Sequence, residues 1–169
     1  FYSTKKATKN TLSYSDENVC VFHILEAQKK YNIPNNLLLA ISIQESGRQV
    51  NNGILTSWPW TINSNGTGRW FESKNDALEW LKIRQSQGIN SNDIGCMQIN
   101  LRWHPDAFKS PNDGFDPFIN VDYSARLLKS LYDNVGDWWE AAGRYHSFTQ
   151  DKKDIYLNDL KRNMRFANV

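Results

Sequence analysis

Residues 34–47 read PNNLLLAISIQESG, the pattern of a short apolar helix with a carboxylate near its end. Proline suits the first position of a helix and glycine is a common stop after the last turn, so Pro34 and Gly47 predict its two ends. The stripe that would face the core consists of Leu37, Leu38, Ile41 and Glu45. An otherwise apolar stripe therefore ends on an acid.

Glu45 is the strongest candidate in the sequence for a chemical role. Burial disfavours the charged form of a carboxyl group, and the last turn of a helix carries partial negative charge. Both effects raise a carboxyl pKa, which is what a general acid needs at neutral pH. The alternative is a glutamate at the edge of the stripe that simply reaches solvent, and this stretch alone leaves both interpretations open.

Length and composition set the class of protein. The chain has 169 residues, is 40% hydrophobic, and carries 20 basic against 18 acidic residues, which suits one domain with one sizeable core. No apolar run approaches the ~20 residues of a membrane span, and the scattered basic residues argue against nucleic-acid binding. Residues 1–13 lack an apolar period and predict a flexible arm, followed by a single domain over residues 14–169.

Helical patterns dominate the remainder of the chain. Further helices are expected from Ser15 through Tyr31, from Ser73 to before Gly88, from Asp116 through Tyr132, from Asp137 through Tyr145, and through Tyr156, Leu160 and Met164. Residues 57–73 contain the turn signal Asn65-Gly66 and predict a small hairpin, whose first strand Pro59 would confine to an edge. Residues 90–93 are expected to form a loop. The predicted class is α+β, predominantly α-helical.

Two residue types leave several interpretations open. Cys20 and Cys96 could form one disulfide or stay as buried thiols, and a zinc site can be written with His23 and His104, although the spacing matches no familiar ligand pattern. The chain also has seven tryptophans, whose faces suit stacking against sugar rings. The tryptophans that could line such a sugar-binding wall, or else pack in the core, are Trp58, Trp60 and Trp70.

Four segments, taken in order, resemble the lytic transglycosylases of the goose-type lysozyme-like superfamily. They are ESG at residues 45–47, WPWTIN at 58–63, GCMQIN at 95–100 and AGRYHS at 142–147. The likeness runs from about Asn18 to about Phe148, and the WPWT and GCMQ segments are similar to a subgroup of exported bacterial enzymes. The resemblance implies a lysozyme-like fold with a small β-hairpin region.

The resemblance also implies a reaction. It is cleavage of the β-1,4 bond between N-acetylmuramic acid and N-acetylglucosamine in peptidoglycan, with formation of 1,6-anhydro ends. Glu45 matches the catalytic acid of the family, which then acts as the base. Intramolecular attack by the 6-hydroxyl removes the need for the second carboxylate that a hydrolase uses. No cofactor and no metal are expected.

The remaining roles follow from the same likeness. Met97 and Gln98 match a pair that packs beside the sugar and hydrogen-bonds it, Tyr145 matches a tyrosine that steadies the acid or the acetamido group, and Ser46 matches a serine that hydrogen-bonds substrate. The expected substrate-binding set is completed by Asn100, His146 and Trp60. Structural alternatives stay open: Met97 as core filler, Gln98 as a loop cap and Tyr145 as an aromatic on a helix face.

The sequence departs from the family pattern at two positions. Cys96 stands where the family usually has leucine, which favours a disulfide between Cys20 and Cys96. His146 stands where an asparagine commonly follows the tyrosine. A histidine can titrate near neutral pH and add pH sensitivity, or it can donate to a backbone carbonyl.

The sequence is also compatible with two other functions. A lysozyme-type hydrolase would need a partner carboxylate, for which Asp93 and Glu72 are the nearest candidates by sequence. A non-catalytic wall-binding component of a secretion apparatus would hold glycan without cutting it. We expect a monomer in the periplasm or cell envelope of a bacterium, exported by a signal that is not in this chain, with peptidoglycan and a secretion or wall-remodelling complex as partners.

Overall fold

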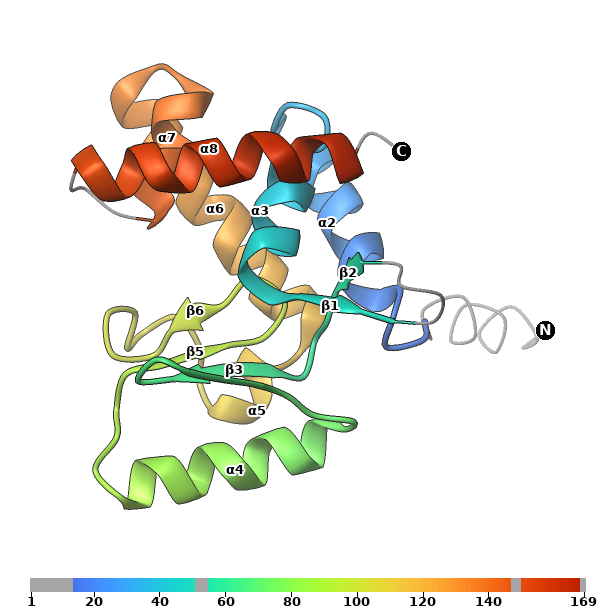
Figure 1. Ribbon diagram of the computed structural model, residues 1–169, viewed down its shortest axis with the longest axis vertical. Coiled ribbons are helices and arrows are strands. Elements are labelled where there is room, and N and C mark those ends of the chain that lie inside the picture. The colour runs from blue at the N-terminus through green and yellow to red at the C-terminus, as the bar shows by residue number, and fades with distance from the viewer. Residues whose placement is uncertain (1–13, 51–54, 147–149, 168–169) are drawn as a thin grey trace.

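The computed structural model describes residues 14–50, 55–146 and 150–167 (Figure 1), so the predicted arm at residues 1–13 lies outside the described residues. The helices are α2 (Val19–Lys30), α3 (Leu37–Ser46), α4 (Lys74–Ser86), α5 (Pro111–Gly114), α6 (Pro117–Val135), α7 (Trp138–His146) and α8 (Gln150–Ala167). The strands are β1 (Gly47–Gln49), β2 (Leu55–Ser57), β3 (Thr61–Ser64), β4 (Thr67–Trp70), β5 (Asn92–Ile94) and β6 (Ile99–Asn100). This arrangement confirms the predicted α+β class.

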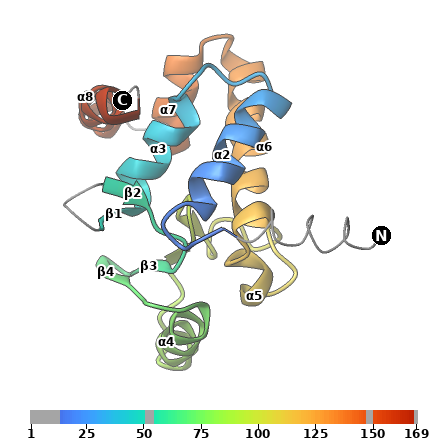
Figure 2. The same cartoon turned by 90° about the vertical axis from the view of Figure 1, so that its right-hand side faces the viewer.

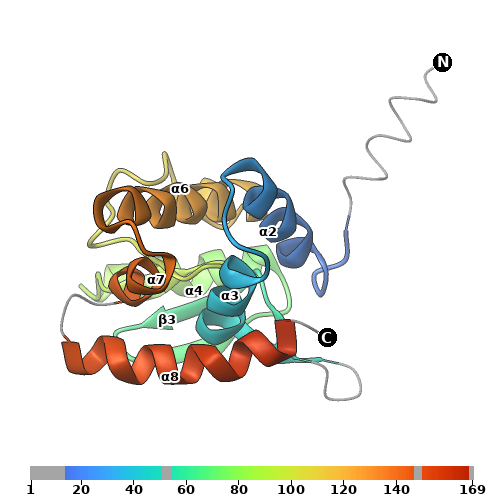
Figure 3. The same cartoon turned by 90° about the horizontal axis from the view of Figure 1, so that it is seen from above.

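Helix α3 is the buried helix of the fold. Its residues from Leu37 to Ile43 are all buried, and the views from two directions place it between α8 on one side and α2 on the other (Figures 2 and 3). A helix that is apolar all round needs neighbours on several sides. The helix begins at Leu37 rather than at Pro34, because Asn36 has a left-handed conformation with φ of 67°.

Helix α2 also begins later than the sequence predicts. The Ser15 carbonyl accepts hydrogen bonds from the amides of Asn18 and Val19 at 3.0 and 2.9 Å, so residues 15–18 form a turn before the helix proper. Cys20, in its first turn, is joined to Cys96 by a disulfide with a Cα–Cα distance of 5.8 Å. The predicted bridge is confirmed, and the zinc interpretation is wrong because the two sulfurs are bonded to each other.

The β-region is larger than the predicted hairpin. Strands β1 and β2 form one antiparallel pair, and a second sheet has the order β4-β3-β5-β6. The expected edge position is wrong, because Pro59 lies in the bend before β3 and β3 pairs on both sides. The loop expected at residues 90–93 overlaps β5, and β6 follows one turn after that strand. These short polar strands gave no signal of their own.

Two hydrophobic clusters stand on either side of the sheet. The larger lies among α2, α3, α6, α7 and α8, and the smaller lies between the sheet and α4 (Figure 2). The two clusters meet where β5 ends and loop 95–98 begins, because Ile94 lies in the smaller cluster while Cys96 and Met97 lie in the larger. Within the described ranges, no helix is long and apolar enough to cross a bilayer.

Removing the disulfide should destabilise the domain substantially. The bridge closes a loop whose ends are 76 residues apart in sequence, for which loss of chain entropy in the unfolded state gives about 4.5 kcal/mol. We expect the double change Cys20→Ala and Cys96→Ala to lower the free energy of unfolding by an amount of this order, measured by urea titration. A loss below about 1 kcal/mol would mean that packing alone holds loop 95–98.

Candidate active site

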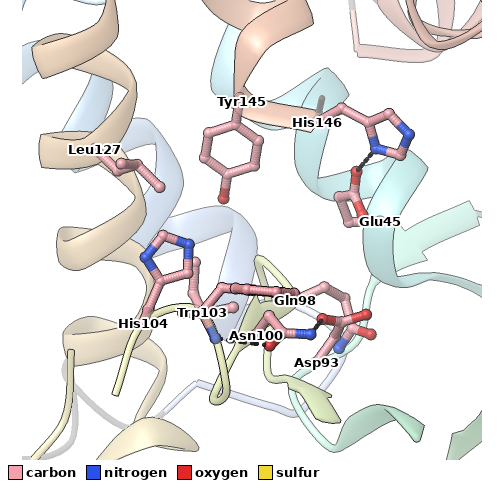
Figure 4. Close-up of a pocket in the computed structure, with 10 residues that line it drawn as sticks. Glu45, Asp93, Gln98, Asn100, Trp103, His104, Leu127, Tyr145 and His146 are labelled. Atoms are coloured by element: carbon pink, nitrogen blue, oxygen red, sulfur yellow. Dashed lines mark hydrogen bonds and ion pairs between the residues drawn. The ribbon is translucent and has the colours of Figure 1, made fainter. Parts of the chain in front are cut away.

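Glu45 lies where three depressions in the surface meet. The acid cavity, of about 290 Å³, runs between α3, α6 and α7 and the β5–β6 turn (Figure 4). Its lining consists of Glu45, Asp93, Gln98, Ile99, Asn100, Trp103, His104, Leu127, Tyr145 and His146. The hairpin hollow, of about 230 Å³, lies beside strands β3 and β4 and also contains Glu45 and Gln98. The helix hollow, of about 250 Å³, lies between Glu45 and α8.

The surroundings of Glu45 favour its protonated form. The side chain is 22% exposed, and burial, together with the charge of Asp93, raises its pKa from 4.5 to about 7. The Tyr156 hydroxyl acts in the opposite direction and lowers that pKa. A carboxyl group with a pKa near 7 is suited to donate a proton at neutral pH and to take one back. The expected buried acid is therefore present at the end of α3.

Tyr145 points its hydroxyl into the acid cavity from α7 (Figure 4). The hydroxyl shares a hydrogen bond of 2.5 Å with the Ser124 hydroxyl on α6 and donates to the Met97 carbonyl at 3.4 Å. Burial raises the pKa of Tyr145 far above its usual value. Tyr145 is thus held as a neutral hydroxyl beside the acid, in the place where the sequence predicts it.

His146 contacts the acid from the other side. Its Nδ1 atom lies 4.0 Å from Oε2 of Glu45, and its ring stacks on the ring of Tyr156 with centroids 4.4 Å apart. Burial and the nearby Lys152 lower the pKa of His146. The imidazole is therefore mainly neutral at neutral pH, and it does not draw the proton away from Glu45.

Tyr156 is a residue that the sequence indicated only as part of an apolar helix face. It is 3% exposed on α8, and its hydroxyl has no hydrogen-bond partner of full geometry among the described residues. It nevertheless lies close enough to Glu45 to lower the carboxyl pKa. A tyrosine, unlike the neighbouring Leu160, brings a polar atom to a buried face. That difference was the available signal.

Asp93 is the second carboxylate of the acid cavity. It accepts a hydrogen bond of 2.8 Å from Nδ2 of Asn100, and burial raises its pKa. The Asn100 amide oxygen in turn accepts from the amides of Arg102 and Trp103 at 2.9 and 3.0 Å. Asn100 therefore positions Asp93 and the following loop. Glu72 lies elsewhere, 77% exposed and paired with Arg48.

Ser46 and Met97 are built into the frame below the acid. Ser46 is 2% exposed, and its hydroxyl donates to the Cys96 carbonyl at 2.6 Å and shares a hydrogen bond of 2.9 Å with Ser57. Met97 is fully buried, and its amide donates to Asn120 at 2.9 Å. For Met97, the geometry corresponds to the core-filling alternative. For Ser46, it shows a hydroxyl engaged with the protein beside the hairpin hollow.

Loop 95–98 has an unusual backbone that places Gln98 in both the acid cavity and the hairpin hollow. Gly95 has φ of 82°, and a Cβ atom there would lie 2.4 Å from the Asn120 amide nitrogen, so only glycine fits. Gln98 also has a positive φ of 52°, and its amide donates to the carbonyls of Thr61 and Gly95 at 3.0 Å. Asn120, a polar residue on the apolar face of α6, was not predicted to matter.

The tryptophans divide between core and surface. Trp58 is buried and donates from Nε1 to the Phe71 carbonyl at 2.8 Å, and Trp60 packs against the smaller cluster beside α4. Trp70, which is 51% exposed, lines the hairpin hollow. Trp103, which is 70% exposed, lines the acid cavity and was not among the candidates.

The model of the transglycosylase SLT domain family matches residues 22–163 of this chain. The match covers α3, the β-region and the helices that surround the acid cavity. The chain belongs to this family. The family match confirms the resemblance that the four sequence segments indicated. The observed α+β architecture agrees with the lysozyme-like fold that this resemblance implied.

Two sets of relatives resemble this SLT domain along most of its length. Protein IpgF of Shigella sonnei is 29% identical over 152 residues, which cover 84% of this chain and 79% of that protein. Invasion protein IagB of Salmonella typhimurium is 29% identical over 134 residues, covering 76% and 64% respectively. No solved structure matches at a significant level.

The SLT domain offers no evident metal centre in its described part. Across residues 14–50, 55–146 and 150–167, no three His, Cys, Asp or Glu side chains lie close enough together to hold a metal ion. The groups around Glu45 that can donate or accept a proton are Asp93, Tyr145, His146 and Tyr156.

The raised pKa of Glu45 makes domain stability depend on pH. Between pH 4.5 and about 7 the unfolded chain releases this proton while the folded SLT domain keeps it, so the stability contribution is present at low pH and is lost as pH rises through 7. At about 1.4 kcal/mol per pKa unit, the loss is about 3 kcal/mol.

Glu45→Gln removes this titration while keeping the shape of the protonated acid. We therefore expect the stability of Glu45→Gln relative to the unmodified domain to increase by about 3 kcal/mol between pH 4 and pH 8, measured by urea unfolding. The exposed Glu79→Gln on α4 is the matched control. A pH-independent difference for Glu45→Gln would show that the acid is already ionised at mildly acid pH.

Proposed function

We propose that this SLT domain is a lytic transglycosylase that cleaves the β-1,4 bond between N-acetylmuramic acid and N-acetylglucosamine. The observation that carries the proposal is Glu45, a carboxyl group with a pKa of about 7 at the junction of depressions on both sides of it. A linear glycan that fills the acid cavity and the hairpin hollow passes the acid with a sugar on each side. Family membership supports peptidoglycan as the substrate.

The proposed reaction uses one carboxyl group twice. Protonated Glu45 donates its proton to the glycosidic oxygen as the bond between C1 of the muramyl ring and that oxygen breaks. The Glu45 carboxylate then removes the proton of the muramyl 6-hydroxyl as O6 bonds to C1. Glu45 ends protonated, the leaving strand gains a 4-hydroxyl, and the other strand gains a 1,6-anhydro end. A pKa near 7 serves both steps.

The neighbouring groups have supporting roles in this proposal. The neutral Tyr145 hydroxyl stands beside the scissile bond or the acetamido group, and Gln98 forms the border between the two sugar-binding depressions. Trp70 and Trp103 offer exposed faces for sugar rings at the two sides of the acid. Three residues contribute indirectly, because they hold the backbone around the acid in place: Ser46, Met97 and Asn100.

A hydrolase is the second candidate function, and the position of Asp93 favours it. Asp93 shares the acid cavity with Glu45, and its charge raises the pKa of that acid. In lysozyme-like hydrolysis a second carboxylate either bonds to C1 or activates water, at separations of about 5–5.5 Å or 6.5–9.5 Å from the acid. The products distinguish the two routes, because water leaves a reducing end and O6 leaves an anhydro end.

The nature of the cleaved ends tests the first candidate. We expect purified peptidoglycan treated with the domain to release muropeptides with 1,6-anhydro ends, identified by mass spectrometry. Glu45→Gln should lose at least about 10³-fold in rate, since the general acid and base are both removed. Exclusively reducing ends would establish the hydrolase. Full wall clearing by Glu45→Gln would show that Glu45 is not the catalytic acid, and no cleavage by the unmodified domain would leave only a wall-binding role.

The Asp93→Asn variant distinguishes the role of the Asp93 carboxylate from that of Glu45. In the transglycosylase we expect anhydro ends to persist and the alkaline limit of kcat/KM to move to lower pH, because Glu45 loses the charge that raises its pKa. In a hydrolase, Asp93→Asn should abolish cleavage. The measurement is the pH profile of kcat/KM for Asp93→Asn and for the unmodified domain, together with the identity of the product ends.

The setting that we propose is the cell envelope. A disulfide between Cys20 and Cys96 suits an oxidising compartment outside the cytoplasm, and the substrate lies there. We propose a secretion or wall-remodelling complex as the partner of the domain there, and one relative is called an invasion protein. The domain is proposed to act there as a monomer.

A further inference from the structure

The helix hollow is a third depression that the linear glycan does not fill. It is lined by Gln44 and Glu45 of α3, His146 of α7, and a face of α8 that includes Lys152, Ile155 and Tyr156. It shares Glu45 and His146 with the acid cavity, and Gln44 and Glu45 with the hairpin hollow. The three depressions therefore branch at the acid, whereas an unbranched strand needs only two of them.

The floor of this hollow is fixed by hydrogen bonds between two helices. The Gln44 amide donates to the Tyr156 carbonyl at 3.1 Å, and its oxygen accepts from the Asn163 amide at 3.1 Å. The His146 ring stacks on Tyr156 and closes one side. The depression is thus built from the packing of α3 against α8 and does not depend on a loose surface side chain.

The walls combine an apolar surface with one available cation. Ile155 is 65% exposed although it is a large apolar residue, and it lies beside the rings of His146 and Tyr156. Lys152 is exposed and joins no ion pair among the described residues, whereas Asp159, which also lines the hollow, is paired with Arg162. With Glu45 protonated, Lys152 provides the unbalanced charge. Such a surface suits a ligand with small apolar groups and a carboxylate.

We propose that the helix hollow binds the lactyl-peptide branch of the muramyl residue at the cleaved bond. This inference rests on the proposed function. N-acetylmuramic acid is the sugar of the strand that carries a branch, and its stem has methyl groups next to free carboxylates. At about 250 Å³ the hollow is smaller than an ordinary ligand pocket, which fits the first part of a stem. Lys152 pairs with a stem carboxylate, and Ile155 contacts the methyl groups.

The test compares strands that carry stems with strands from which an amidase has removed them. We expect the domain to cleave stem-bearing strands with the higher kcat/KM. Lys152→Glu should reduce the ratio of kcat/KM for stem-bearing over stem-free strands about fivefold, the scale of losing an exposed ion pair and adding repulsion. The effect should lie in KM, because the subsite contributes binding away from the reacting atoms.

Lys161→Glu is the matched control. Lys161 is an exposed lysine on the same helix, and nine residues at 3.6 per turn place it about 180° around α8 from Lys152. Lys161→Glu changes the net charge by the same amount as Lys152→Glu, but at a position that does not face the hollow. An equal fall in the ratio for both variants would show a general charge effect and overturn the subsite, as would no preference for stem-bearing strands in the unmodified domain.

A binding measurement makes the inference independent of cleavage. The probe is N-lactyl-alanyl-glutamate, added to the Glu45→Gln variant, which keeps the shape of the hollow. We expect NMR shifts at the Ile155 methyl and His146 ring signals, which Lys152→Glu removes and Lys161→Glu retains. If strands are never cleaved but these shifts are seen, the proposed reaction fails and the subsite stands. If strands are cleaved but no shifts occur, the subsite fails alone.

Discussion

The burial of α3 on all sides is the constraint on which this domain depends. A helix whose residues from Leu37 to Ile43 are covered must be packed between α2, α8 and the β-region. Its last turn then emerges at the border of the helical layer and the sheet, where the chain turns into β1. Gly47 permits that turn, because a Cβ atom there would lie 2.3 Å from the Ile43 carbonyl. Glu45 is consequently desolvated yet reachable from three directions.

A second constraint is the shape of loop 95–98, which passes directly beneath the acid. The Cys96 carbonyl accepts hydrogen bonds from Ser42 at 3.2 Å and Ser46 at 2.6 Å, and the Cys96 side chain is bonded to α2. Asn120 holds the other side of the loop through the Met97 amide and the Ile94 carbonyl at 2.9 Å. Preorganised groups of this kind spare an active site from rearranging during the reaction. Much of what resembles a substrate-binding motif here is the frame for Glu45, Gln98 and Asp93.

Local sequence patterns predicted most of the helices because each apolar stripe and each cap depends on residues a few positions apart. The capping serine at Ser73 and the cap at Asp116 mark the starts of α4 and α6 as expected. The start of α3 was placed one turn too early, because proline is also compatible with the turn that the left-handed Asn36 creates. Strands β5 and β6 were missed because they are two or three residues long and gain their order from β3.

The sequence by itself determined that an acid ends the apolar stripe of a helix, that Tyr145 lies on another helix directly before His146, and that the chain follows the pattern of a transglycosylase family. These are properties of spacing along the chain. Only the tertiary structure decided that Asp93 stands in the cavity of Glu45 while Glu72 does not, and that Tyr156 and Lys152 face the acid from α8. Those relations join residues 48 to 111 positions apart. Their proximity comes from helix and sheet packing, which side-chain periodicity does not encode.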